Sequence, residues 1–212
     1  MRSGERNLRF EPFRSQSAQW PATGRHVLAQ FDAESVVVYQ AYRPSIGHYA
    51  AEHGHFGGEF SLQRMSWIKP NFLWMMYRCG WATKEGQEVV LGVWLARAAF
   101  DEILSLAVPS TYWDHRYADR EAWQADVSRS DVRLQWDPDH GPSGQPVERR
   151  AVQLGLRGAA LAKYAREWIL KIEDITPLVR EQHARFRRDP DTLETPAEEV
   201  YPCLPSSRIE AD

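Results

Sequence analysis

The sequence predicts an α+β fold in a single domain, with a mixed or antiparallel sheet and flanking helices. Its 212 residues suit one domain, because hydrophobic cores usually divide only in longer chains. A hydrophobic content of 43%, with 12% aromatic residues, is enough to fill one core. Segments typical of strands and of helices are mixed along the chain, without the regular alternation that a doubly wound parallel sheet requires.

The first predicted elements lie between residues 35 and 58. Residues 35–42 read Ser-Val-Val-Val-Tyr-Gln-Ala-Tyr, and such a run of β-branched and aromatic residues predicts a strand. Pro44 suits the first turn of a helix, which we expect to reach about His53. Three glycines then indicate a loop, at positions 54, 57 and 58.

The next elements are a short strand at residues 63–68 and a helix that begins at Pro70. Gly80 marks the C-terminal end of this helix. One of its faces is apolar at helical spacing and is expected to lie in the core: Phe72, Met75, Met76 and Cys79.

The second half of the chain continues the mixture of strands and helices. In chain order we first expect a strand at 88–95, a helix at 96–106 and a loop with a short helix at 109–129. A strand at 131–136, a turn at 137–144 and a partner strand at 151–156 then suggest a hairpin. The chain continues with a helix at 158–170, a strand at 171–175 and a last helix from 176 to about 187.

Three regions follow from composition. Residues 1–30 are polar and predict a flexible leader, and residues 31–188 form the globular domain. Residues 189–212 carry seven acidic residues against one arginine and are rich in proline, which predicts a disordered tail. Because the whole chain has a net charge of −3, the remainder is mildly basic. Such a body suits a phosphate-bearing ligand and is far less basic than a dedicated duplex-DNA binder.

Residues 61–81 combine aromatic and basic side chains and contain no acidic residue. Trp67 and Trp74 stand among Arg64, Lys69 and Arg78. Aromatic faces beside cations can stack a base or a nicotinamide ring and hold its phosphates. The same composition also suits an aromatic core with basic side chains reaching out to solvent. The sequence leaves both interpretations open.

The cysteines and the hydropathy of the chain bear on disulfides, metal sites and cellular location. Cys79 and Cys203 are far apart and match no metal-binding spacing, so we expect neither a disulfide framework nor a metal site. The longest apolar runs are too short to cross a bilayer, and no membrane partner is expected. A cytoplasmic location is the resulting prediction.

Three phrases resemble the family of domains of unknown function numbered DUF4291. They are Val-Tyr-Gln-Ala-Tyr-Arg-Pro at 38–44, Arg-Met-Ser-Trp-Ile-Lys-Pro-Asn-Phe-Leu-Trp-Met-Met-Tyr-Arg at 64–78 and Gln-Leu-Gly-Leu-Arg-Gly at 153–158. The similarity extends from about residue 36 to residue 183. It implies a family without implying an activity.

The order of elements also resembles ADP-ribosyltransferases of the Arg-Ser-Glu type. This resemblance implies an ADP-ribosyltransferase-like fold, NAD as substrate, and Arg43, Ser66 and Glu173 as catalytic residues. Arg43 would grip the pyrophosphate and Ser66 would hold the glutamate or the ribose. Glu173 would bond the ribose and stabilise the positive charge that develops as nicotinamide leaves. The chain departs from the usual pattern around Ser66, and Lys171 stands two residues before Glu173.

The leading hypothesis is therefore a nucleotide-binding protein that transfers ADP-ribose from NAD to an acceptor such as a protein. The expected binding residues are Gln40, Tyr42, Arg64, Trp67, Lys69, Trp74 and Arg78. One alternative is a non-catalytic module that stacks the bases of single-stranded nucleic acid on residues 64–81. A second alternative is a scaffold that binds protein partners, with the aromatic stretch in its core.

Overall fold

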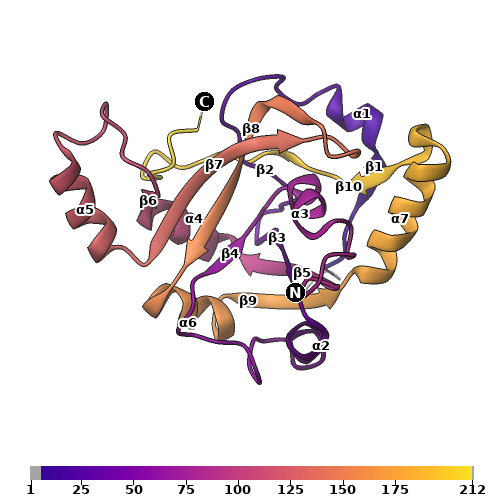
Figure 1. The fold of residues 1–212 in the computed structure, drawn as a ribbon, viewed down its shortest axis with the longest axis horizontal. Helices are drawn as coiled ribbons and strands as arrows, with labels where there is room; N and C mark the ends of the chain where they lie inside the picture. The colour runs from indigo at the N-terminus through magenta and orange to yellow at the C-terminus, as the bar shows by residue number, and fades with distance from the viewer. Residues whose placement is uncertain (1–5, 212) are drawn as a thin grey trace.

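Three long antiparallel strands form the first sheet. The computed structural model describes residues 6–211 (Figure 1). The strand order is β3 (Ser35–Tyr42), β5 (Val89–Ala96) and β9 (Ile169–Asp174). Strands β3 and β5 pair along their full lengths, from Ser35 opposite Ala96 to Tyr42 opposite Val89. The β-branched and aromatic residues that predict β3 thus lie in a fully paired strand.

Four strands form the second sheet, in the order β4 (Ser66–Ile68), β8 (Pro146–Leu156), β7 (Val132–His140) and β6 (Ala107–Pro109). All neighbours are antiparallel except β6 and β7, which are parallel. Outside the regular ladders, Tyr39 of β3 forms an isolated bridge with Lys69 just after β4. The Tyr39 N–H donates to the Lys69 carbonyl at 2.7 Å, and the Lys69 N–H donates back at 3.2 Å. This bridge ties the two sheets together.

Two cores lie on opposite faces of the first sheet. The inner core combines that sheet with the second sheet, through residues such as Val38, Val93, Ile172, Leu134 and Leu154. The outer core packs the other face of the first sheet against helices α3 and α7, through Val37, Trp94, Phe72 and Val179. Because successive residues of a strand point to opposite faces, β3 and β5 supply both cores in alternation.

Seven helices surround the sheets in the described part of the chain. They are α1 (Phe13–Ser17), α2 (Pro44–His53), α3 (Phe72–Cys79), α4 (Arg97–Leu106), α5 (Arg120–Arg129), α6 (Gly158–Arg166) and α7 (Thr176–Arg188), followed by a short 3-10 turn at Pro190–Thr192. Figure 1 shows α5 and α7 at opposite ends of the molecule. None of these helices is long and apolar enough to cross a membrane.

Helix α3 shows why the local sequence forms this element. The side chain of Asn71 accepts a hydrogen bond from the Trp74 N–H at 2.7 Å and caps the N-terminus. Gly80 ends the helix in a left-handed conformation, with φ 58°. Met75 and Met76 are buried, as their spacing predicts. The α+β class is confirmed, and the sheets are mostly antiparallel.

The two ends of the described chain pair with each other as strands, in the regions where composition predicts a flexible leader and a disordered tail. Strand β1 (Phe10–Pro12) pairs with β10 (Glu194–Pro196), and β2 (Leu28–Ala29) pairs with β11 (Glu199–Val200). Tyr201 in the acidic segment is only 2% exposed. Residues 1–5 of the predicted leader and residue 212 of the predicted tail lie outside the described residues. The large apolar residues of the acidic segment, Leu193, Tyr201 and Ile209, are buried against the body.

Candidate functional site

A cleft of about 720 Å³ opens beside the end of β3, β4 and helix α3. The loop between α2 and β4 forms another wall, through residues 59–61 and 64–65. Eight of the ten predicted site residues line this one cleft: Gln40, Tyr42, Arg43, Arg64, Ser66, Trp67, Lys69 and Arg78. Residues from three separate stretches of sequence are therefore brought together here.

A hydrogen-bond network centred on Gln40 lies where β3 and β4 meet. Gln40 follows the apolar residues of β3 and is 2% exposed, so its amide needs partners inside the protein. Its Nε2 donates to the Tyr42 hydroxyl and to Ser66 Oγ, each at 2.8 Å. Its Oε1 accepts from the Tyr164 hydroxyl at 2.5 Å. These bonds fix the orientation of Gln40, Tyr42 and Ser66.

Tyr42 and Ser66 form a close pair within this network. Their hydroxyl oxygens are 2.6 Å apart. Burial raises the pKa of Tyr42 above its usual range, and this effect exceeds the lowering by its hydrogen bonds to Ser66 and Gln40. Tyr42 is therefore neutral at physiological pH. The pair can donate or accept hydrogen bonds to a ligand, and it carries no charge.

Positive charge dominates the walls of the cleft. Among the described lining residues, Glu59 is the one acid, and it already pairs with Arg43 at 2.6 Å. Arg64 and Arg78 have no ion pair with any residue of the described chain. Arg78 lies beside the ring of Trp74, with its guanidinium carbon 5.9 Å from the ring centroid. Both guanidiniums remain available to an anion.

Lys69 is the most unusual cation of the cleft. It is 6% exposed, and no described residue forms an ion pair or hydrogen bond with its ammonium group. The pKa of Lys69 is lowered to about 8, chiefly by burial and also by the nearby Arg78. Asp137 and Cys79 partly oppose this lowering. The Lys69 side chain is thus almost enclosed, and its ammonium group faces the cleft without a partner in the described chain, which marks it as a position that a ligand can reach.

Trp67 supplies an aromatic face to the same cleft. It lies opposite Gly155 in the β4–β8 ladder and is half-buried. A Cβ at Gly155 would come within 3.0 Å of the Trp67 ring and within 2.6 Å of Met65 Sδ, so the indole packs directly on the backbone of β8. The missing side chain at position 155 thus makes room for the ring.

A sequence model of one protein family matches most of the chain. That family is described as Domain of unknown function (DUF4291), and the match covers residues 26–201. This chain belongs to the DUF4291 family. The match includes every residue of the cleft described above. No curated protein is similar enough to count as a match. The family confirms the first resemblance, and nothing in it supports the resemblance to ADP-ribosyltransferases.

Glu173 does not reach the cleft of this DUF4291 domain. In the first sheet Gln40 lies opposite Leu91, which lies opposite Asp174. Glu173 lies opposite Gly92 and therefore points to the other face. There it pairs with Lys171 at 2.7 Å. The expected convergence of the three catalytic residues thus holds for Arg43 and Ser66 and fails for Glu173.

Trp74 also lies away from the cleft. It is 4% exposed and stacks against His140, with ring centroids 5.2 Å apart, and against Tyr77. In the DUF4291 domain Trp74 packs helix α3 against His140 of β7, and the Arg78 guanidinium lies over its ring. The aromatic residues of segment 61–81 therefore have two different roles: Trp74 packs in the interior, and Trp67 lines the cleft.

Asp137 is a neighbour of the cleft that the sequence does not predict. Its residue type and the following prolines and glycines predict a turn, but β7 continues through it to His140. Its carboxylate accepts hydrogen bonds from Gln135 at 2.8 Å and from Gln153 at 2.7 Å. It also raises the pKa of Lys69. Only the strand register shows that these residues are close to Lys69.

A metal site in the described part of the DUF4291 domain would require a cluster of metal-binding side chains. Within residues 6–211, no three His, Cys, Asp or Glu side chains are grouped in a way that could hold a metal ion. Cys79 and Cys203 are both free. The cleft offers cations, hydroxyl groups and one indole face, which together suit an anion that carries a flat ring.

Proposed function

We propose that this domain binds a phosphate-bearing, nucleotide-like small molecule in the cleft. One observation carries the proposal: Arg64, Lys69 and Arg78 line a single cavity and find no ionic partner within the described chain. Guanidinium groups suit the oxygens of a phosphate, and Lys69 adds to the positive charge that attracts an anion into the cleft.

The remaining features of the cleft support the same class of ligand. Its volume of about 720 Å³ lies in the range of small-molecule sites, which is about 300–1,000 Å³. Trp67 offers a ring on which a base can stack. Tyr42 and Ser66 offer neutral hydroxyl groups that suit a ribose. A nucleotide has all three kinds of group in one molecule.

NAD is one candidate within this class, and transfer of its ADP-ribose to an acceptor such as a protein stays a prediction. Arg43 and Ser66 lie in the cleft, which is consistent with that reaction. Glu173 lies on the other face of the sheet and is not available to the same ligand. The ADP-ribosyltransferase-like fold is likewise an expectation. NAD and ADP-ribose therefore belong among the ligands to be tested, beside ordinary nucleotides.

Calorimetric titration of the whole chain tests the proposal. The ligands are AMP, ATP, NAD, ADP-ribose, adenosine and a short single-stranded oligonucleotide. We expect at least one of the phosphorylated compounds to bind more tightly than adenosine, because the three cations act on phosphate. Binding should also weaken as salt is added. An equal affinity for adenosine, or no binding of any phosphorylated compound, would refute the proposal.

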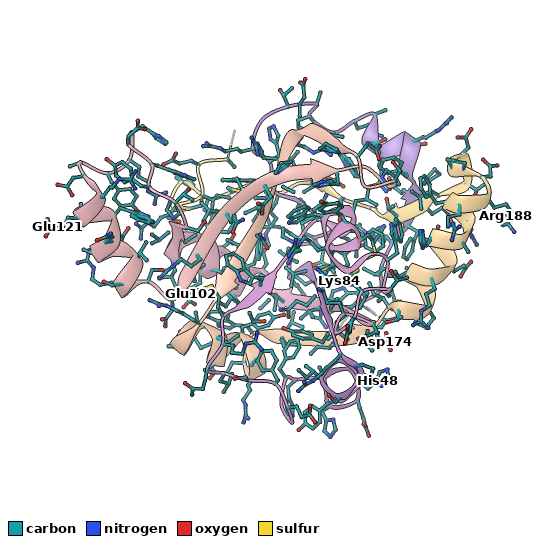
Figure 2. The ribbon with its side chains drawn as sticks, in the orientation of Figure 1. His48, Lys84, Glu102, Glu121, Asp174 and Arg188 are labelled. Carbon is teal, nitrogen blue, oxygen red and sulfur yellow. The ribbon has the colours of Figure 1, made fainter. Side chains whose placement is uncertain are left out.

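Matched variants locate the binding site. Hydrogen bonds to charged groups contribute about 1.5–3 kcal/mol. Because both guanidiniums are exposed, we expect the lower end, a loss of roughly tenfold for Arg64→Ala and for Arg78→Ala. Arg188→Ala is the control, since Arg188 is an exposed arginine at the outer edge of α7 (Figure 2). An equal loss in the control would place the ligand elsewhere.

The same titration separates the two alternatives. A single-stranded oligonucleotide that binds far more tightly than every mononucleotide would favour a nucleic-acid module. A protein that binds none of these compounds would favour a scaffold for protein partners. Trp67→Leu should weaken a stacked ligand in either of the binding cases.

A further inference from the structure

The backbone holds Lys69 at a fixed place in the cleft. Its N–H and carbonyl both bond to Tyr39, so the residue is attached to β3 although it follows β4. Pro70 and the capping residue Asn71 come directly after it and begin helix α3. Lys69 therefore stands where two sheets and a helix meet, and its stem is enclosed by them.

Burial and the nearby Arg78 favour the neutral form of the Lys69 amine. Asp137 and Cys79 have the opposite, smaller effect. Arg78 and Cys79 approach from α3, and Asp137 approaches from β7. Asp137 already accepts two amide hydrogen bonds, from Gln135 and Gln153. An amine that is largely desolvated and lies near another cation has the arrangement that activates a lysine as a nucleophile.

We propose that Lys69 forms an imine with the carbonyl group of a phosphate-bearing aldehyde or ketone. This inference rests on the proposed function, because the phosphate is held by Arg64 and Arg78 of the same cleft. It deepens that function by naming the ligand class: a phosphorylated compound with a free carbonyl group, such as a nucleotide whose terminal sugar opens to its aldehyde form.

The chemistry needs no oxidant and no metal. The lone pair of the neutral Nζ attacks the carbonyl carbon, and the electrons of the C=O π bond move to oxygen. The nitrogen loses a proton and the oxygen gains one, which gives a carbinolamine. This intermediate loses one molecule of water and becomes the imine. The step is reversible, so the ligand can be released by water.

The population of neutral amine decides how fast this reaction is. With a pKa of about 8, Lys69 is neutral in roughly one molecule in ten at pH 7. An ordinary lysine, with a pKa of about 10.4, is neutral in fewer than roughly one in a thousand. Lower basicity makes an amine somewhat less nucleophilic. We therefore expect Lys69 to react on the order of tenfold faster than an exposed lysine at neutral pH.

The chain is well suited to a labelling experiment because it has only four lysines: Lys69, Lys84, Lys163 and Lys171. The probe is pyridoxal 5′-phosphate, with cyanoborohydride to reduce the imine and peptide mass spectrometry to locate it. Lys84, labelled in Figure 2, is the internal control, because its side chain is exposed and is not among those that line the cleft. Comparing the two peptides within the wild-type protein requires no variant to fold.

The expected result is preferential labelling of Lys69, with a rate that rises to half its maximum near pH 8. Inorganic phosphate should slow it, and pyridoxal without the phosphate should label Lys69 more slowly. Lys69→Arg should remove the fast label, and Lys84→Arg should retain it. Labelling of Lys84 as fast as Lys69 would overturn the inference. If nucleotides still bind in that case, the proposed function stands alone; if they do not bind either, both proposals fail.

Discussion

A chain that ends at Arg188 tests how strongly the C-terminal segment supports the body. The truncation removes three large apolar residues that are buried in the folded protein: Leu193, Tyr201 and Ile209. Burying a side chain of this kind contributes about 1.5–3 kcal/mol, so the three together account for about 5–9 kcal/mol. Domains of this size have a net stability of about 5–15 kcal/mol. We expect the truncated chain to be unfolded or close to unfolding at 25 °C.

Tyr201 is the single residue that best measures this contribution. Its ring lies edge-on to Phe31 and Phe100, at centroid distances of 5.1 and 5.2 Å. Its hydroxyl donates to Asp101 at 2.7 Å, and its N–H donates to the Val27 carbonyl at 2.7 Å. Truncation of a buried aromatic residue costs about 3–5 kcal/mol, which is the loss expected for Tyr201→Ala.

Urea denaturation followed by circular dichroism and tryptophan fluorescence gives the measurement. Leu204→Ala is the matched control, because Leu204 belongs to the same segment and is exposed; it should change stability by less than about 0.5 kcal/mol. If the chain of residues 1–188 unfolds at the same urea concentration as the full chain, the docking of the segment contributes nothing. The predicted disordered tail would then be the better description.

Three further outcomes are expected. Met75→Ala should cost about 2–5 kcal/mol because Met75 is buried, whereas Arg78→Ala should cost less than about 1 kcal/mol; urea melts of both variants check this. Burial raises the pKa of Glu198, so the folded protein keeps a proton that the unfolded chain releases above about pH 4.5. The free energy of unfolding should therefore fall as the pH rises from that value. In Glu198→Gln the urea midpoint should depend less on pH, because the titrating carboxyl group is gone. Gly155→Ala should displace the Trp67 ring and weaken ligand binding in calorimetry, at a stability cost of about 1–3 kcal/mol. Unchanged ligand binding in Gly155→Ala would show that the Trp67 indole does not contact the ligand.

The central elements could be predicted because their signals are local. The strand β3 follows from a run of β-branched residues, and α2 follows from Pro44 at its start and Gly54 at its end. Eight of the ten site residues share the cleft for a related reason: seven of these eight flank or lie within two short segments, residues 40–43 and 64–69, which the structure brings together. Once the bridge between Tyr39 and Lys69 forms, these segments must be neighbours.

The parts that could not be predicted depend on long-range pairing. Glu173 follows the expected order along the chain, but a shift of one residue in a strand reverses the face to which a side chain points. Asp137 has the composition of a turn, and only its pairing with Ala151 keeps it in a strand. The acidic segment has few apolar residues, and their effect depends on partners such as Phe31 and Phe100 that are remote in sequence.

The pairing of β1 with β10 and of β2 with β11 has a consequence for synthesis. These ladders join residues 10–12 and 28–29 to residues 194–196 and 199–200, across almost the whole chain. During translation β1 and β2 are made long before β10 and β11, and they lack these strand partners until residues 194–200 have left the ribosome. Contacts of such long sequence separation slow folding, because a large loop must close before they form. We therefore expect β1 and β2 to be open to proteases and chaperones on the nascent chain, and to become protected only once residues 194–200 have emerged.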